Sequence, residues 1–259
     1  MPNTILKSVA LSVGLAFGSL TAASAATVDT VLSLVIDVSG SINSTEYNLQ
    51  MEGYEKAFRD SDIQNAITDT DGGNRNGSIA VNLIQFSSTA SERLGFAVLD
   101  SLQDVEDFAD AIANVTRFSS LSTGIGEGIE LASSTISDWL DESGNSASRA
   151  VVDVSGDGTN NAGIAPSTAR DAALAADVDA INAIAIQSTT LQAYFDNNVV
   201  GGTNSFSLFA SDFDAFDSAI KRKLKAEITG TNPIPLPAGA WLLLSGIGGL
   251  AALRRRKKA

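Results

Sequence analysis

Short apolar runs rich in β-branched residues alternate with amphipathic segments through most of the chain, and this alternation limits the possible folds more than any other feature. Apolar runs that predict strands occupy residues 31–36, 78–86, 94–99, 150–154, 178–186 and 206–209. Amphipathic segments that predict helices occupy residues 44–59, 101–115, 126–140, 167–176, 190–196 and 212–228. We therefore expect one α/β domain, a doubly wound and mostly parallel sheet with helices on both faces.

The composition limits the chemistry of any site. The chain has no cysteine and no histidine, which excludes disulfides, thiolate zinc sites, cysteine nucleophiles, Ser-His-Asp triads and imidazole ligands. A metal held by this chain is coordinated by oxygen, which favours Mg²⁺, Mn²⁺ or Ca²⁺. The 30 acidic and 17 basic residues give a net charge of −13, which argues against nucleic acid as a partner.

The N-terminal segment has the three parts of a secretory signal peptide. Lys7 precedes an apolar run over residues 9–20, and small residues occupy 21–26. Cleavage after Ala25 or Ala26 fits the pattern equally well, so we assign residues 1–25 to the signal peptide and expect the protein to be exported.

The C-terminal segment predicts a short membrane span. Residues 234–238 read Ile-Pro-Leu-Pro-Ala, an apolar stretch covers 238–253, and five basic residues follow at 254–258. The apolar stretch is close to the shortest length that crosses a bilayer, and the basic cluster should stay in the cytoplasm. The segment 231–259 is therefore predicted to carry a transmembrane segment with a basic cytoplasmic end.

This C-terminal segment resembles the PEP-CTERM type of sorting tail, in the variant whose signature is Val-Pro-Leu-Pro-Ala. The resemblance implies recognition by an exosortase, a membrane-embedded protease-transpeptidase, in a Gram-negative bacterium. It implies an inner-membrane anchor before processing and a cell-surface or extracellular location afterwards. A plain anchor that is never processed remains the alternative.

Without both terminal segments the exported part, residues 26–232, keeps 11 basic and 30 acidic residues, a net charge of −19. Such a surface is soluble and repels polyanions and anionic lipid. Four of the remaining basic residues, Lys221, Arg222, Lys223 and Lys225, lie near the C-terminal end of the last predicted helix, where the helix dipole favours cations.

Oxygen-bearing side chains follow the predicted strands, where a doubly wound sheet binds its ligands. Asp37, Ser39 and Ser41 come after the first strand, Thr123 lies in a glycine-rich loop that enters a helix, and Asp157 follows the strand at 150–154. Carboxylate and hydroxyl oxygens suit Mg²⁺. The alternative interpretation of the first three is a loop that caps the next helix.

The order D-x-S-x-S, then T, then D-G resembles the metal-ion-dependent adhesion site of von Willebrand factor type A domains, and so does the Gln-Phe-Ser-Ser segment at 85–88. Residues 37–39, 50–54, 152–158 and 160–161 resemble more narrowly a bacterial subfamily of domains of unknown function. Gly156 stands where the commoner pattern has threonine.

The resemblance covers about residues 28–228, within an expected domain at 26–230. It implies a divalent metal held by Asp37, Ser39, Ser41, Thr123 and Asp157. It also implies an open metal position that takes an anionic oxygen from a protein or polysaccharide partner.

Three functions remain open at this point. The first is a metal-dependent binding or adhesion module. The second is a metal-dependent hydrolase, which without histidine needs an Asp or Glu base, and Asp153, Glu127 and Glu46 are the candidates. The third is a structural matrix protein with a stabilising metal. Asp153 lies inside an apolar strand, and we favour a hydrogen-bonded structural role for it over a catalytic one.

Overall fold

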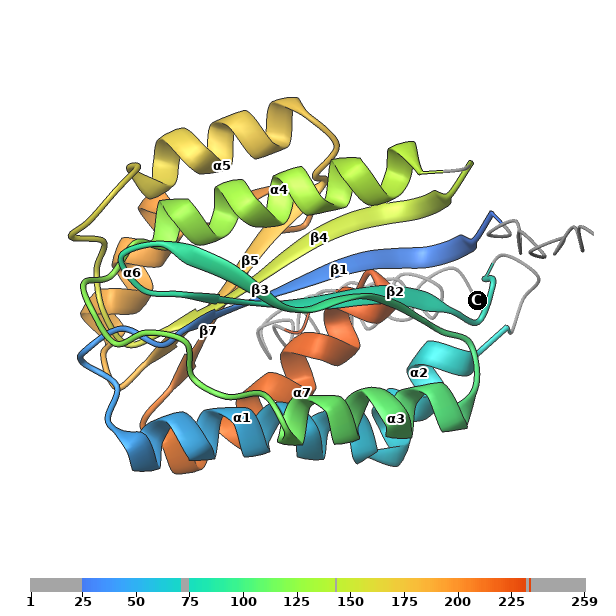
Figure 1. The fold of residues 1–259 in the computed structure, drawn as a ribbon, viewed down its shortest axis with the longest axis horizontal. Coiled ribbons are helices and arrows are strands. Elements are labelled where there is room, and N and C mark those ends of the chain that lie inside the picture. Colours follow the sequence, from blue (N-terminus) through green and yellow to red (C-terminus); the bar gives the residue numbers. More distant parts are fainter. Residues whose placement is uncertain (1–24, 71–74, 143, 232, 234–259) are drawn as a thin grey trace, which may run out of the picture.

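The computed structural model describes residues 25–70, 75–142, 144–231 and 233 (Figure 1). The predicted signal peptide up to residue 24, the sorting motif, the apolar span and the basic cluster lie outside these residues. Within the described ranges, no helix has both the length and the apolar character that crossing a bilayer requires.

A central, mostly parallel sheet confirms the predicted α/β class. Its strands are β1 (Thr27–Asp37), β2 (Ile79–Phe86), β3 (Ala90–Leu99), β4 (Ser146–Gly156), β5 (Ala180–Ile186), β6 (Gly201–Gly202) and β7 (Ser207–Ala210). The strand order is β3-β2-β1-β4-β5-β6, and β7 also pairs with β5. Strand β3 pairs antiparallel with β2, and β6 pairs antiparallel with β5. The other pairs are parallel.

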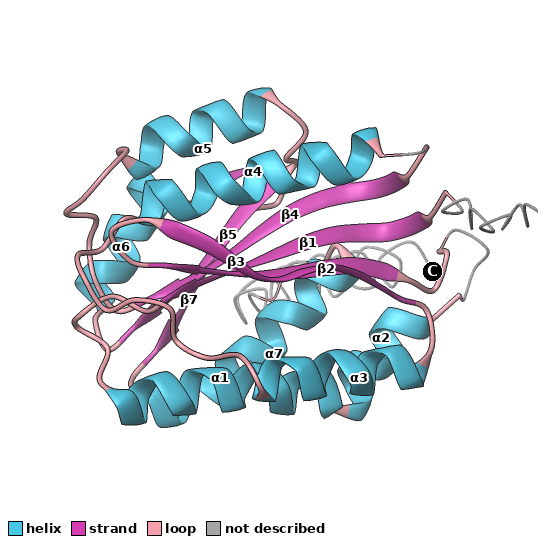
Figure 2. Cartoon of the chain, viewed as in Figure 1, coloured by secondary structure: helices cyan, strands magenta, loops and turns pink. Residues whose placement is uncertain are grey.

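Helices cover both faces of the sheet, as predicted (Figures 1 and 2). They are α1 (Ser44–Arg59), α2 (Ser61–Thr68), α3 (Leu102–Ala113), α4 (Ile125–Asp141), α5 (Pro166–Ala175), α6 (Thr189–Asn198) and α7 (Phe213–Thr229). Helices α1, α2, α3 and α7 lie on one face, and α4, α5 and α6 lie on the other.

The sequence did not predict α2. This helix begins after Asp60, whose side chain accepts a hydrogen bond from the Asp62 N–H and caps the new helix. It is only eight residues long, too short for the spacing of Ile63, Ala66 and Ile67 to give a clear helical period.

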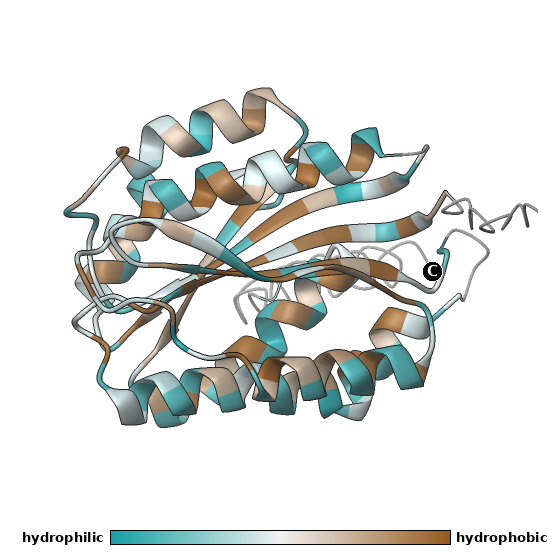
Figure 3. Cartoon of the chain, viewed as in Figure 1, coloured by the Kyte–Doolittle hydropathy of each residue, from teal (hydrophilic) through white to brown (hydrophobic). Residues whose placement is uncertain are grey.

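Two apolar cores lie on opposite faces of the sheet, and β1 contributes to both. Leu32, Leu34 and Ile36 pack on the side of α1 and α7, whereas Val31 and Val35 pack on the side of α4. In Figure 3 apolar residues run along the central strands. Burial on both faces is typical of a strand that is central in a parallel sheet.

The direction of the strands decides where ligands and chain ends lie. The carboxyl ends of β1 and β4 are adjacent, because Ile36 pairs with Ser155. Helix α7 returns to the opposite, amino edge, where the Arg149 guanidinium near the start of β4 lies 3.5 Å from the Glu227 carbonyl oxygen.

Helix α4 approaches the sheet closely because residue 128 has no side chain. A Cβ added at Gly128 would lie 2.7 Å from Val35 Cγ1 and 3.1 Å from Phe86 Cδ1. We expect Gly128→Ala to push α4 away from β1 and β2 and to lower the free energy of unfolding by about 1–3 kcal/mol in chemical denaturation.

Gly95→Ala in β3 is the matched control for Gly128→Ala, because a Cβ added at Gly95 meets no atom within 4 Å. It should leave the denaturation midpoint almost unchanged. Equal effects of the two substitutions would contradict the close packing of α4.

Candidate metal centre

The structure brings together all five side chains that the sequence singled out as metal ligands. They lie at the carboxyl edge of the sheet and form a chain of hydrogen bonds. The Thr123 hydroxyl donates to Ser39 Oγ at 3.1 Å, and the hydroxyls of Ser39 and Ser41 are also 3.1 Å apart. Ser41 in turn donates to Asp157 Oδ1 at 2.6 Å. Asp37 Oδ1 accepts the Ser39 N–H at 2.8 Å.

Asp37 has the most unusual surroundings of the five. Its carboxyl group is completely buried, and its second oxygen, Oδ2, has no hydrogen-bond partner in the structure. Burial raises the pKa of Asp37 to about 7, against hydrogen bonds from Ser39 that lower it, and the nearby Asp157 carboxylate raises it further. A buried carboxylate oxygen without a partner is costly unless a cation or a proton satisfies it.

The donor set fits a hard divalent cation. Within the described ranges, no three Asp or Glu side chains gather where they could share a metal ion, so a metal here depends on hydroxyl oxygens as well as on Asp37 and Asp157. Burial also raises the pKa of Asp157, against a lowering hydrogen bond from Ser41, and the carboxylate of Glu46 raises it further. Two carboxylates that both lose solvation at one edge favour a positive ion between them.

Gly156 leaves room beside the free oxygen of Asp37. A Cβ at this position would lie 2.9 Å from Asp37 Oδ2 and 3.2 Å from Asp37 Cβ. The commoner pattern has threonine at this position, and its side chain would occupy the space beside Asp37. Glycine at 156 therefore allows β4 to approach the Asp37 carboxylate closely.

Arg117 fixes the loop that carries the two serines, a role that was not predicted from the sequence. Its guanidinium donates to the Val38 carbonyl at 2.7 and 3.0 Å and to the Ser39 carbonyl at 2.6 Å. The Gln50 amide holds the preceding carbonyl, that of Asp37, at 2.9 Å. Arg117 lies in an irregular segment without periodicity, and its basic charge in an acidic chain was the only signal that marked it.

Three side chains fix the backbone of the Thr123 loop. Asn161 accepts the Thr123 N–H at 2.8 Å, and Asn160 accepts the Ile125 N–H at 2.7 Å, at the start of α4. Ser87 accepts the N–H of Leu121 at 2.7 Å. Ser87, Asn160 and Asn161 entered the sequence analysis only through the family resemblance, and the structure shows that they position the loop.

The three candidate bases are all engaged in other interactions. Glu46 accepts the Asn43 N–H at 2.8 Å and so caps α1. Glu127 accepts the Ile164 N–H at 3.0 Å. Asp153 is fully buried and pairs with Lys223 of α7. Each carboxylate therefore holds backbone or balances a buried charge.

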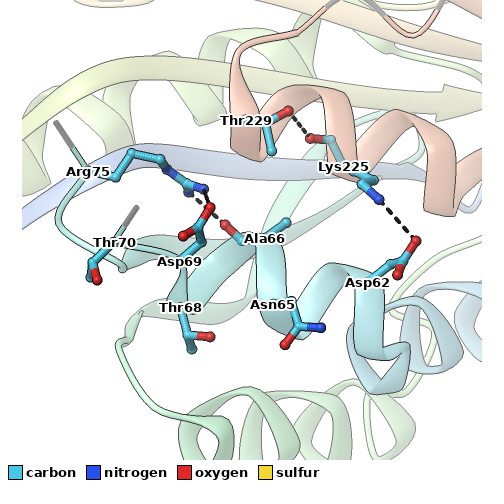
Figure 4. A pocket seen from close by; sticks show the side chains of 9 residues that line it. All are labelled: Asp62, Asn65, Ala66, Thr68, Asp69, Thr70, Arg75, Lys225 and Thr229. Atoms are coloured by element: carbon cyan, nitrogen blue, oxygen red, sulfur yellow. Dashed lines mark hydrogen bonds and ion pairs between the residues drawn. The ribbon is translucent and has the colours of Figure 1, made fainter. Parts of the chain in front are cut away.

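A separate hollow of about 590 Å³ lies between α2 and the end of α7 (Figure 4). Its basic side chains already have partners: Lys225 lies 3.0 Å from Asp62, and Arg75 donates to the Ala66 carbonyl at 2.6 Å. The hollow shares no residue with the metal centre.

Comparison with known proteins identifies the family. Residues 27–232 match the family model described as "Protein of unknown function (DUF1194)". The chain belongs to the DUF1194 family. This agrees with the bacterial subfamily that its sequence motifs resembled. No curated protein sequence matches this DUF1194 chain.

Solved structures share the fold of this DUF1194 chain. Proximal thread matrix protein 1 from the mussel byssus aligns with a TM-score of 0.56 and 22% identity, over 77% of this chain and 46% of the mussel chain. The pilus adhesin SpaC from Lactobacillus rhamnosus GG aligns with a TM-score of 0.55 and 16% identity, over 80% of this chain and 31% of the adhesin.

A von Willebrand factor type A protein from Catenulispora acidiphila aligns with a TM-score of 0.53 and 12% identity, over 78% of this chain and 43% of that one. The chain thus spans less than half the length of each of these structures. At this level of identity the likeness establishes the fold, which is von Willebrand A-like as the sequence motifs implied.

The burial of Asp37 predicts a pH dependence of the metal-free protein. The pKa of Asp37 rises from 3.8 to about 7 on folding. Between pH 4 and 7, Asp37 therefore keeps its proton in the folded protein but has released it in the unfolded chain. The free energy of unfolding should therefore fall as pH rises from 4 to 7, by up to about 1.4 kcal/mol per pH unit.

The test of this pH dependence is urea unfolding in EDTA from pH 4 to 7. Asp37→Asn should remove the part of the slope that Asp37 contributes, while the slopes of other groups remain in both proteins. Identical slopes for the two proteins would show that Asp37 titrates normally.

Proposed function

We propose that this chain is a divalent-metal-dependent binding or adhesion module. Asp37, Ser39, Ser41, Thr123 and Asp157 would hold one Mg²⁺, or Mn²⁺ or Ca²⁺ in its place, at the carboxyl edge of the sheet. The observation that carries the proposal is the buried, partnerless Oδ2 of Asp37 beside a chain of hydroxyl groups.

The charge of this donor set suits the capture of an anion. Only two of the five side chains are carboxylates, so a bound cation would keep much of its positive charge and would attract an anionic oxygen of a partner. Ser41 is exposed while Asp37, Ser39 and Thr123 are buried. The open metal position would therefore face solvent on the Ser41 side, where a carboxylate of a protein or acidic polysaccharide can reach it.

The structural relatives favour binding over hydrolysis. The mussel structure is described as having a "zinc occupied MIDAS motif", and the Lactobacillus protein is a pilus adhesin. Both are matrix or adhesion proteins, and here Glu46, Glu127 and Asp153 are engaged elsewhere. The oxygen ligands of this chain favour Mg²⁺ over zinc.

The proposed module acts outside the cell. The signal-peptide pattern at residues 1–25 and the sorting-tail pattern at 231–259 support export, anchoring in the inner membrane, processing by an exosortase and display at the cell surface or release. The net charge of −19 over residues 26–232 suits a saline medium, where salt screens self-repulsion.

The metal site is tested by titrating Mg²⁺, Mn²⁺ and Ca²⁺ separately into EDTA-treated protein by calorimetry and thermal melting. One cation should bind per chain and raise the melting temperature, with a stabilisation of about 2.7 kcal/mol at 100 times the Kd. Asp37→Asn and Asp157→Asn should remove this rise, whereas Asp107→Asn, an exposed acid on α3, should respond like wild type.

The same proteins separate binding from a purely structural metal. Wild type should be retained on a polyuronate matrix or an aspartate-bearing peptide in Mg²⁺ and released by EDTA, at a salt concentration that screens the repulsion between the acidic domain and an acidic probe. Stabilisation by Mg²⁺ without retention on either probe would support the structural matrix protein instead, and no response to any metal would refute the site.

The sorting tail has its own test. Replacing Pro235, Leu236 and Pro237 by alanine leaves the apolar span and basic cluster unchanged, so membrane insertion should persist while processing fails. Immunoblots of membrane fractions should then show a longer, membrane-bound form. Mature wild-type protein that still contains residues 254–258 by mass spectrometry would show a permanent anchor.

A further inference from the structure

A lysine is sealed inside the protein between two carboxyl groups. Lys223 Nζ lies 2.6 Å from Asp153 Oδ1 and 2.7 Å from Glu227 Oε1, and none of the three side chains is exposed. The Asn182 amide donates to Glu227 Oε1 at 2.9 Å. These residues belong to β4, β5 and α7, and Lys223 is buried although its basic neighbours Lys221, Arg222 and Lys225 are not.

The cluster is unbalanced in charge and in hydrogen bonds. Two carboxyl groups face one ammonium group, and among the described residues Asp153 Oδ2 and Glu227 Oε2 have no hydrogen-bond partner. Burial raises the pKa of Glu227 to about 8. The Asp153 carboxylate raises this pKa further, whereas Lys223 lowers it. A raised pKa favours a proton on Glu227, which would balance the charge of the Lys223–Asp153 ion pair. An ion pair sealed from water usually contributes little net stability.

We propose that Lys223 and Asp153 condense to an intramolecular amide bond, with Glu227 carrying the proton between them. The bond would join α7 covalently to β4 in the interior of the domain. The reaction needs no cofactor and no oxidant, only the three side chains that the fold brings together.

The proposed step balances in atoms and charge. The ammonium of Lys223 and the carboxylate of Asp153 first become an amine and a carboxylic acid by proton transfer through Glu227. Nζ then attacks Cγ of Asp153, the Nζ–Cγ bond forms, and the Cγ–Oδ2 bond breaks. Two of the three Nζ protons leave with Oδ2 as one water, the third stays on the amide nitrogen, and Glu227 regains its proton.

The surroundings of Asp153 make its carboxyl group the acceptor. Tyr54 donates a hydrogen bond to Asp153 Oδ1 at 3.3 Å, where it would stabilise the charge that develops on this oxygen as the amine attacks. Oδ2, which has no partner, is the oxygen free to leave. Asn182 and Lys223 both contact the same oxygen of Glu227, Oε1. The other oxygen, Oε2, is therefore available to carry the proton.

The fold supplies the two conditions that such a condensation needs. Fixed neighbours react far faster than the same groups in solution, because the entropy of bringing them together is already lost. The second condition is a proton acceptor beside the ammonium group, because the free amine is the nucleophile, and the carboxyl oxygens of Asp153 and Glu227 lie 2.6 and 2.7 Å from Lys223 Nζ. Exclusion of water and removal of two buried charges favour the amide over hydrolysis.

The experiment is peptide mapping by mass spectrometry of the purified, denatured full chain, without any metal requirement. A branched peptide should join Lys223 to Asp153, with a mass lower by one water than its two parts. Lys223→Met and Glu227→Gln should both lack this peptide. Lys221→Met, at a partly exposed neighbour that pairs with Asp60 and Asp217, should retain it.

Four results would overturn the proposal. Linear peptides alone in wild type would show that the cluster is only an ion network. A mass lower by one ammonia would show that Asn182, not Asp153, is the acceptor. A link between Lys223 and Glu227 would join two residues of α7 and would leave β4 unconnected. A branched peptide that persists in Glu227→Gln would remove the glutamate from the reaction. Since wild type itself is mapped, a variant that fails to fold does not weaken the test.

Discussion

The position of β1 at the centre of the sheet is the constraint on which the rest of the structure depends. Ten of its eleven residues are buried, and its last residue is Asp37. A carboxylate at the end of such a strand enters the interior with few protein partners. Three features at the carboxyl edge of the sheet accommodate it: hydroxyl groups on the next loop, glycine at 156, and a guanidinium that holds the Val38 and Ser39 carbonyls.

Strand β4 passes through two polar environments of opposite kinds. Asp157 follows its end at a half-exposed edge where a partner can approach. Four residues earlier, Asp153 is sealed between α1 and α7, with Tyr54 and Lys223 as its contacts. The edge is open to solvent, so a bound ion or partner could exchange there, whereas the cluster around Asp153 is closed to solvent. The Tyr54 oxygen also lies 3.2 Å from the Ser155 hydroxyl, which can donate to it, so Tyr54 contacts β4 both at the buried cluster and near the end of the strand.

The sequence predicted the layers, and it singled out the five oxygen-bearing side chains that the structure brings together, because both have local signals. Strands buried on both faces give continuous apolar runs, and four of the five side chains lie at or just after the end of a strand. Helix α2 was missed because eight residues carry too little periodicity. Arg117 was missed because its role depends on a contact with Val38, 79 positions away in the sequence.

The burial of Lys223 was not predicted from the sequence, although the spacing of its helix indicates it. Phe216, Ile220, Lys223 and Glu227 follow the three- and four-residue steps of one helix face, and all four are buried. Charge obscured this period, since a lysine is expected outside. Only the positions of Asp153 and Glu227 in space explain why it points inward.

The two edges of the sheet give the domain a mechanical axis. The candidate metal centre lies at the carboxyl edge, whereas α7 ends near Arg149 at the amino edge. A pull between a captured partner and the end of α7 would run along β1 and β4. The hydrogen bonds that pair these two strands from residues 27 to 36 run across that line. They would be loaded together in shear rather than opened one by one, which is the arrangement in which a sheet resists tension best.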